Sequence, residues 1–321
     1  MKGSLTGILE TLKGEISKVI VGQEYLIERL FVALITKGHV LLEGVPGLAK
    51  TKTLTALTKC INASMKRIQF TPDLLPSDLI GTEVYNQHTG DFSIRKGPVF
   101  TNLLLADEIN RSPAKVQSAL LQAMQEREVT IGEETFRLPD PFLVLATQNP
   151  IEQEGTYPLP EAQVDRFIMK LKVEYPSYEE EVEILSLVAS SCTESASPEE
   201  LNEVIGISDL QRIREEADKL YIDPKIDHYI VSLVQASRKP ESVGLDNLID
   251  WGASPRAGIA MKQCARALAY LRGKEFVTPD DVKEIAHDVL RHRILPSFEA
   301  EARGVDSDNI VSVLLKNVTV P

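Results

Sequence analysis

The pattern of apolar positions predicts an amphipathic helix at the start of the chain, followed by short buried strands with helices between them. The apolar residues of the first helix share one face and are Leu5, Ile8, Leu9, Leu12 and Ile16. Short runs rich in apolar residues follow at 40–42, 103–105, 142–146 and 167–173. Runs of this length between turn residues are typical of buried strands. Helical spacing at 54–61 and 116–124 predicts helices between them.

The second half of the chain carries helical patterns with short connections, so a small helical bundle is expected there. One apolar stripe runs from Ile226 to Val234. Two further helices have clear start signals, because a proline follows Ser254 and another follows Thr278. The acidic stretch between the halves is predicted to be a linker. The expected organisation is a core over residues 1–190, a linker over 191–203 and a helical domain over 204–321.

Composition and charge limit the classes of function. The chain has 321 residues, of which 43% are hydrophobic and 26% charged, and no apolar run approaches the length of a membrane span. The net charge of −12 argues against a generally basic nucleic-acid binder, because neutralising phosphates supplies most of that affinity. Cys60, Cys192 and Cys264 are too far apart to indicate a disulfide framework or a zinc site. A reducing cytoplasm is the expected location.

Residues 44–51 read GVPGLAKT, which predicts a phosphate-binding loop. The usual form of this loop has a glycine immediately before the lysine, and here Ala49 takes that place. Gly44 and Gly47 still allow the backbone to curl. A strand precedes the loop and a helix follows it, and amide groups at a helix start attract anions. We expect Lys50 and the loop amides to hold phosphate groups; a surface loop with a chance lysine is the alternative.

Polar side chains end the next two predicted strands. Asp107 and Glu108 follow the run at 103–105, where two carboxylates are costly unless they have partners or chemical work. Asp107 is expected to hold Mg²⁺ together with Thr51, and Glu108 to polarise water for attack on a γ-phosphate. Asn149 follows the third run and is expected to orient that water. Solvated loop acids and ordinary turn chemistry are the alternatives.

Other features carry weaker expectations. Two hairpins are predicted, one turning at Thr89-Gly90 and the other at Gly132. They could contact a substrate or simply cover a sheet edge. Trp251 is expected to be a packing anchor, and His292 to be a surface residue rather than a metal ligand.

The succession GVPGLAKT, LLLADEIN, LATQNP, EAQVDRF and GASPRA resembles the motifs of AAA+ ATPases of the MoxR family, and it covers nearly the whole chain. The order and spacing of these motifs are more specific than any one of them, and an alanine before the lysine is usual in that family. The resemblance implies an α/β fold: a P-loop AAA+ large domain with a parallel sheet flanked by helices, followed by a small all-α lid domain. It also implies that the hairpins are the helix-2 insert and the pre-sensor-1 insertion.

The resemblance assigns roles to individual residues. Walker B would comprise Asp107 and Glu108, and sensor 1 would be Asn149. The arginine finger would be Arg166 and sensor 2 would be Arg256. The segment VGQE resembles one that lies beside the adenine base, through Val21 and Gly22. The Walker A residues would surround the phosphates and are Gly44, Val45, Pro46, Gly47, Leu48, Ala49, Lys50, Thr51 and Lys52.

The same resemblance implies an activity, Mg²⁺-dependent ATP hydrolysis in a homo-oligomeric ring, most often a hexamer. Arg166 would act on the ATP of the neighbouring subunit. Hydrolysis would drive chaperone-like remodelling of protein clients, often with a von Willebrand factor A domain partner. Three alternatives stay open: a nucleic-acid motor, disfavoured by the acidic charge, a scaffold that binds ATP without turnover, and a magnesium-chelatase motor subunit. The Asp107-Glu108 pair disfavours the scaffold, which needs no catalytic base.

Overall fold

The computed structural model describes residues 7–44, 50–88, 90–149, 155–194 and 200–320. A five-stranded parallel sheet with the order β2-β5-β8-β1-β9 forms its centre. The strands are β1 (Val40–Glu43), β2 (Met65–Gln69), β5 (Leu103–Asp107), β8 (Leu143–Gln148) and β9 (Met169–Lys172). The strands expected from the apolar runs are confirmed. Strand β2 was not expected, because polar side chains dominate this edge strand.

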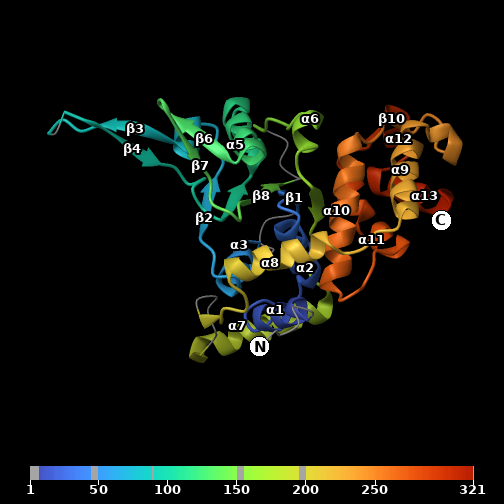
Figure 1. Cartoon of the computed structure of the whole chain (residues 1–321), viewed down its shortest axis with the longest axis horizontal. Helices are drawn as coiled ribbons and strands as arrows, with labels where there is room; N and C mark the ends of the chain where they lie inside the picture. The colour runs from blue at the N-terminus through green and yellow to red at the C-terminus, as the bar shows by residue number, and fades with distance from the viewer. Residues whose placement is uncertain (1–6, 45–49, 89, 150–154, 195–199, 321) are drawn as a thin grey trace.

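Helices cover both faces of the sheet (Figure 1). They are α1 (Ile8–Ile16), α2 (Glu24–Ile35), α3 (Lys50–Cys60) and α5 (Ala114–Glu126). Successive residues of a strand point to opposite faces, so Leu41 and Leu42 enter different hydrophobic clusters. The Leu42 cluster contains the apolar faces of α1, α2 and α3. The Leu41 cluster contains the apolar face of α5.

Two hairpins extend from this core, as expected. They pair β3 (Gly81–Tyr85) with β4 (Phe92–Lys96), and β6 (Glu128–Ile131) with β7 (Glu134–Arg137). Each forms its own two-stranded sheet and is not paired with the central sheet. The β3–β4 hairpin points away from the body of the molecule (Figure 1). Short helices connect these elements: α4 (Pro76–Ile80), η1 (Ile109–Arg111) and α6 (Glu161–Val164).

The C-terminal helical region is defined here as α8 to α13; α9 to α13 lie beside the sheet, and α8 crosses below it near α2 (Figure 1). Its helices are α8 (Ile207–Asp218), α9 (Pro224–Arg238), η3 (Pro240–Val243), α10 (Pro255–Leu271), α11 (Pro279–Leu290), α12 (Phe298–Ala302) and α13 (Ser307–Asn317). The expected start signals are confirmed, since Ser254 and Thr278 are the N-cap residues of α10 and α11. A small antiparallel pair, β10 (Ile249–Trp251) with β11 (Leu295–Pro296), is an addition to the expected bundle.

The helical region packs directly on the core. One hydrophobic cluster runs from α1 and α2 through the sheet to α8, α10 and α11. The buried guanidinium of Arg214 on α8 donates to the carbonyl oxygen of Leu34 at 2.8 and 3.0 Å and to Asp140 at 2.7 Å. Helix α7 (Tyr178–Glu194) ends inside the segment 191–203 that was expected to be a linker. The division into two domains remains a prediction.

Two expectations about single residues are wrong. Trp251 is 73% exposed on β10, so it is not a packing anchor. His292 is only partly accessible, and its Nε2 lies 3.0 Å from the carbonyl oxygen of Phe167. Burial lowers the pKa of this imidazole well below its ordinary value. Both residues are close to turns, where local sequence carries little information on burial. In the described part of the chain, no helix has the length and apolar character needed to cross a membrane.

Candidate active site

Polar residues that follow three strands meet at the carboxyl edge of the central sheet. Because β5, β8 and β1 are parallel neighbours, their carboxyl ends share one edge. The residues there are Asp107 and Glu108 from β5, Asn149 after β8 and Gly44 after β1. Among the described residues, the structure therefore brings the residues expected for Walker B and sensor 1 to the same edge as Gly44, the first residue expected for Walker A.

Lys50 is the first residue of α3 and points back toward the end of β1. Its Nζ donates to the carbonyl oxygen of Gly44 at 2.6 Å. Burial lowers the pKa of Lys50, and the charges of Asp107 and Glu108 oppose that shift. A Cβ at Gly44 would lie 3.0 Å from the carbonyl oxygen of Val173, so the backbone passes too close here for most side chains. Lys50 thus lies close enough to Asp107 and Glu108 for their charges to act on it, as expected for a phosphate-binding lysine.

Of the remaining residues expected in the phosphate loop, only Thr51 and Lys52 are among the described residues. Thr51 is half-buried in the first turn of α3, whereas Lys52 is exposed. The hydroxyl of Thr51 and the carboxylate of Asp107 are the oxygen ligands that Mg²⁺ prefers, so these residues fit the ion. The expected phosphate-loop residues Val45, Pro46, Gly47, Leu48 and Ala49 lie outside the described residues, and their roles remain predictions.

Asp107 is held by two side chains. Its Oδ1 accepts the hydroxyl of Thr147 at 2.6 Å, and the same hydroxyl oxygen accepts the backbone N–H of Glu108 at 2.9 Å. Its Oδ2 accepts from Arg67 Nη2 at 2.6 Å and Nε at 3.1 Å. Arg67 is thus placed to share the carboxylate with a bound cation. Sequence reasoning missed this residue.

Glu108 is held in a different way, through its backbone and two donors. Its φ of 56° puts it in the left-handed region, which is uncommon for a residue other than glycine and is often found at functional sites. Its Oε2 accepts from Gln69 Nε2 at 2.7 Å and from Arg111 Nη1 at 3.1 Å. Gln69 and Arg67 are two apart on β2 and share a face. Two polar residues at a spacing of two in a strand are the sequence signal that could have identified Arg67 and Gln69 as site residues.

Arg166 and Arg256 lie together, at a hollow of about 330 Å³ that both of them line. Arg166 is exposed, and its Nη1 donates to the carbonyl oxygen of Leu121 at 3.3 Å. Arg256 is also exposed and lies 3.4 Å from Asp165 Oδ2, a carboxylate that Arg293 already holds at 2.7 Å. Neither Lys50 nor the two Walker B carboxylates line this hollow. Within the described residues, the two arginines therefore share a hollow that these three residues do not line.

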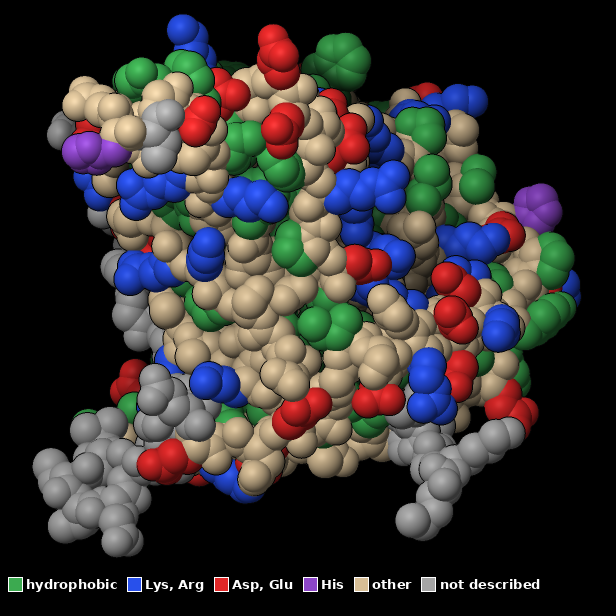
Figure 2. Space-filling view, turned by 60° about the vertical axis from the view of Figure 1, so that its left-hand side comes forward, with side chains coloured by type: hydrophobic (Ala, Val, Ile, Leu, Met, Phe, Trp, Pro, Cys, Tyr) green, Lys and Arg blue, Asp and Glu red, His purple; other side chains and the backbone are tan. Residues whose placement is uncertain are grey.

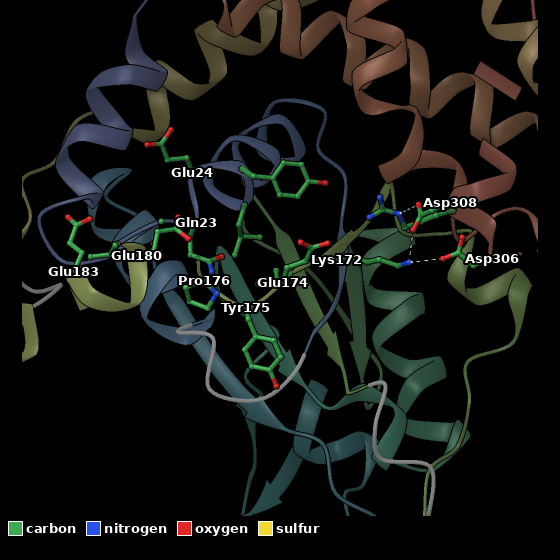
Figure 3. A pocket seen from close by; sticks show the side chains of 16 residues that line it. Gln23, Glu24, Lys172, Glu174, Tyr175, Pro176, Glu180, Glu183, Asp306 and Asp308 are labelled. Carbon is green, nitrogen blue, oxygen red and sulfur yellow. Dashed lines mark hydrogen bonds and ion pairs between the residues drawn. The ribbon is translucent and has the colours of Figure 1, made fainter. Parts of the chain in front are cut away.

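Val21 and Gly22 line a larger pocket of about 880 Å³ (Figure 3). Gly22 has φ of 68°, and a Cβ there would lie 2.6 Å from Glu180 Oε1. Val173, which contacts Gly44, lines the same pocket. The pocket therefore adjoins the start of the phosphate loop, where a nucleoside attached to bound phosphates would lie.

The far wall of this pocket comes from the helical region. Lys172 on β9 points across to α13 (Figure 3), and its Nζ lies 2.5 Å from Asp308 Oδ2. Arg291 Nε donates to Asp308 Oδ1 at 2.9 Å. Burial would raise the pKa of Asp308, but Lys172 and Arg291 together hold it at about 2. No local pattern in the sequence indicated these three residues, because they meet only through packing of α11 and α13 on β9.

Known proteins show the same architecture. The profile of the ATPase family associated with various cellular activities (AAA) matches residues 39–169, and that of the AAA lid domain matches residues 245–313. A crystal structure of a candidate ATPase from Cytophaga hutchinsonii superposes with a TM-score of 0.91 and 49% identity, covering 98% of this chain and 95% of that one. The fold and the strand-end residues define an AAA+ ATPase.

Sequence relatives identify the branch. Chaperone MoxR1 of Mycobacterium tuberculosis is 48% identical over 316 residues, covering 98% of this chain and 82% of the relative. Protein MoxR of Methylorubrum extorquens is 30% identical over 325 residues, covering 96% of this chain and 93% of the relative. The chain belongs to the MoxR family of AAA+ ATPases.

Proposed function

We propose that this chain hydrolyses ATP in a Mg²⁺-dependent reaction, works as a homo-oligomeric ring, and uses turnover to remodel protein partners. The exposure of Arg166 and Arg256 at a hollow that neither Lys50 nor the Walker B carboxylates line carries the proposal. Both arginines are exposed at one hollow, so both can reach a site on a neighbouring subunit. An arginine supplied in trans is worth roughly 10³–10⁵ in rate. A closed ring, a hexamer by family resemblance, gives every site such a neighbour.

Within one subunit, each strand-end residue has a chemical task. Lys50 would exchange the carbonyl of Gly44 for phosphate oxygens. Mg²⁺, held through Thr51 and Asp107, supplies charge neutralisation on the phosphates when bound. Glu108 would accept the proton of the attacking water that Asn149 orients.

Gln69 and Arg111 both donate to Glu108. Both donors bind Oε2, so the acceptor positions of this oxygen are occupied and it is not open to a proton from water. The base must therefore lose at least one of these hydrogen bonds before it acts. Nucleotide binding or contact with a client would supply the displacement.

Mixing two inactive variants tests the ring directly. Glu108→Gln removes the base but keeps both arginines, and Arg166→Ala removes the finger but keeps the base. We expect each variant alone to hydrolyse ATP at least roughly 100-fold more slowly than the native chain. Mixed subunits should regain activity, because a Glu108→Gln subunit supplies its arginine to an Arg166→Ala site. Arg256→Ala, mixed in the same way, tests the second arginine.

Arg212→Ala is the matched control, because Arg212 is an exposed arginine of α8 paired with Asp209. Its rate should equal that of the native chain. Mixtures that stay as inactive as their components would rule out sharing of residues between subunits. A rate of ATP hydrolysis per subunit that stays the same at every protein concentration would exclude the ring.

The β3–β4 hairpin supports a protein client. Its side chains Val84, Tyr85 and Phe92 are exposed, and the two rings pack with centroids 5.2 Å apart. Exposed apolar groups on a projecting hairpin suit an unfolded protein segment. The relative named as a chaperone, MoxR1, is consistent with such a client. A von Willebrand factor A domain partner, and a site of action in the cytoplasm, are proposed on family resemblance alone.

A nucleic-acid client is the second candidate. Figure 2 shows Lys and Arg side chains in a band across the upper half of one face, interleaved with hydrophobic ones. A band of basic groups can follow the phosphate backbone of a single strand. Stimulation of ATP hydrolysis by reduced, unfolded α-lactalbumin, lost in Tyr85→Ser with Phe92→Ser, would favour the protein client. Stimulation by a single-stranded oligonucleotide, falling with added salt, would favour nucleic acid.

A further inference from the structure

Tyr25 links the nucleoside pocket to the helical region. It is the second residue of α2, directly after the VGQE segment, and it lines the pocket with Val21 and Gly22. Its side chain is 41% exposed, although most of α2 is buried. A half-exposed aromatic ring beside a cavity presents an apolar surface to whatever fills the cavity.

The position of the ring is set by two groups. Arg29, one helical turn along α2, places its guanidinium carbon 4.9 Å from the ring centroid and so covers one face. The hydroxyl of Tyr25 donates to Asp288, a residue of α11 that is only 2% exposed. Asp288 also accepts from Arg29 Nε at 2.8 Å and lies 3.5 Å from Arg291. The ring therefore belongs to α2, but its hydroxyl is held by Asp288, a buried carboxylate of the helical region.

We propose that Tyr25 is the positioning residue for the nucleotide base, and that its bond to Asp288 couples the base to α11. The proposal rests on the proposed function, since it takes the pocket as the nucleoside site. The open part of the ring packs against a purine, while the hydroxyl fixes the ring relative to α11. When the nucleotide base displaces the Tyr25 ring, the hydrogen bond transmits the displacement to Asp288. A shift of α11 in turn moves the wall of the pocket. Burial and the charge of Asp288 raise the pKa of Tyr25, so the hydroxyl remains a donor at neutral pH.

Two substitutions separate the ring from the hydroxyl. Tyr25→Leu removes the aromatic surface, and Tyr25→Phe keeps it but loses the bond to Asp288. The probes are ATP and inorganic tripolyphosphate, each with Mg²⁺ in a binding titration. We expect Tyr25→Leu to raise Kd for ATP roughly tenfold, as losing a base–aromatic contact does, and to leave Kd for tripolyphosphate unchanged. Tyr221→Leu, at another exposed tyrosine outside the pocket, should change neither.

Tyr25→Phe tests the coupling. We expect its Kd for ATP to stay close to the native value. ATP should slow hydrogen exchange in α11 (279–290) of the native chain, and that effect should disappear in Tyr25→Phe. Tight ATP binding by Tyr25→Leu overturns the base contact, and equal weakening toward both probes overturns it as well. Unchanged protection of α11 in Tyr25→Phe overturns the coupling. If the native chain binds neither probe, the proposed function itself fails.

Discussion

The side-chain amide of Gln69 donates to Glu108 Oε2 at 2.7 Å, across the neighbouring strands β2 and β5. This contact joins an edge strand with no recognised motif to the expected catalytic base. It arises because β2 and β5 are parallel and in register, with Gln69 opposite Asp107. Glu108 is therefore hydrogen-bonded by a residue that is 39 positions away in sequence.

We expect Gln69→Leu to raise the basal rate of ATP hydrolysis. A hydrogen bond to a charged group is worth roughly 1.5 kcal/mol, and losing this one opens Glu108 Oε2 to the attacking water, which corresponds to about tenfold in kcat. KM for ATP should stay the same, because Gln69 does not line the nucleoside pocket. The control is Gln122→Leu, which removes a glutamine bonded to Glu126 on the exposed side of α5. A lower kcat in Gln69→Leu would mean that the amide orients the base rather than restrains it.

Thr147 makes a second prediction. Its hydroxyl is buried and bridges Asp107 and the backbone N–H of Glu108. Thr147→Val should lower the free energy of unfolding by roughly 1–3 kcal/mol, because both groups lose a buried partner. It should also weaken Mg²⁺ binding, because Asp107 can then move, so hydrolysis should need a higher Mg²⁺ concentration. Thr147→Ser keeps the hydroxyl and should behave as native in urea unfolding. Equal stability of the valine and serine variants would contradict the bridge.

His39 predicts how stability depends on pH. The ring is fully buried, with Nδ1 accepting from Val144 N–H at 3.0 Å and Nε2 lying 3.1 Å from the carbonyl oxygen of Met124. Burial lowers the pKa of His39 from 6.5 to about 4. The unfolded chain takes up the proton first, so the stabilisation is complete above pH 6.5 and is lost as the pH falls from 6.5 toward 4. About 3 kcal/mol is at stake.

The measurement is urea unfolding of the native chain and His39→Asn at several pH values. We expect His39→Asn to be less stable at pH 7, but to lose less stability than the native chain between pH 6.5 and 4. His88→Asn is the control, because His88 is exposed on the β3–β4 hairpin. Parallel pH curves for the native chain and His39→Asn would show that the buried ring does not titrate in this range.

Gly22 and Gly244 form a matched pair at the nucleoside pocket and away from it. Both have positive φ, 68° and 74°, so an alanine at either costs roughly 1–2 kcal/mol of stability. A Cβ meets Glu180 at Gly22 and nothing within 4 Å at Gly244. Gly22→Ala should therefore raise Kd for ATP severalfold, whereas Gly244→Ala should not. Equal ATP affinity in the two variants would remove Gly22 from the site.

Local sequence determined most of the elements and the chemistry at the strand ends. Apolar runs predicted the strands before Lys50, Asp107 and Asn149, since a buried strand must be apolar whatever lies next to it. Strand β2 escaped this reasoning because an edge strand buries less and keeps polar side chains. Trp251 was misjudged for the related reason that an aromatic residue near a turn carries no local signal of its burial.

Tertiary structure alone decided which of these residues meet. The order β2-β5 places Gln69 at Glu108, and packing of α11 on α2 places Asp288 at Tyr25. Packing at the core also put Arg166 and Arg256 at one hollow. Contacts of this kind depend on strand order, register and helix packing. These are set by the burial of the whole apolar surface, which no single stretch of sequence contains.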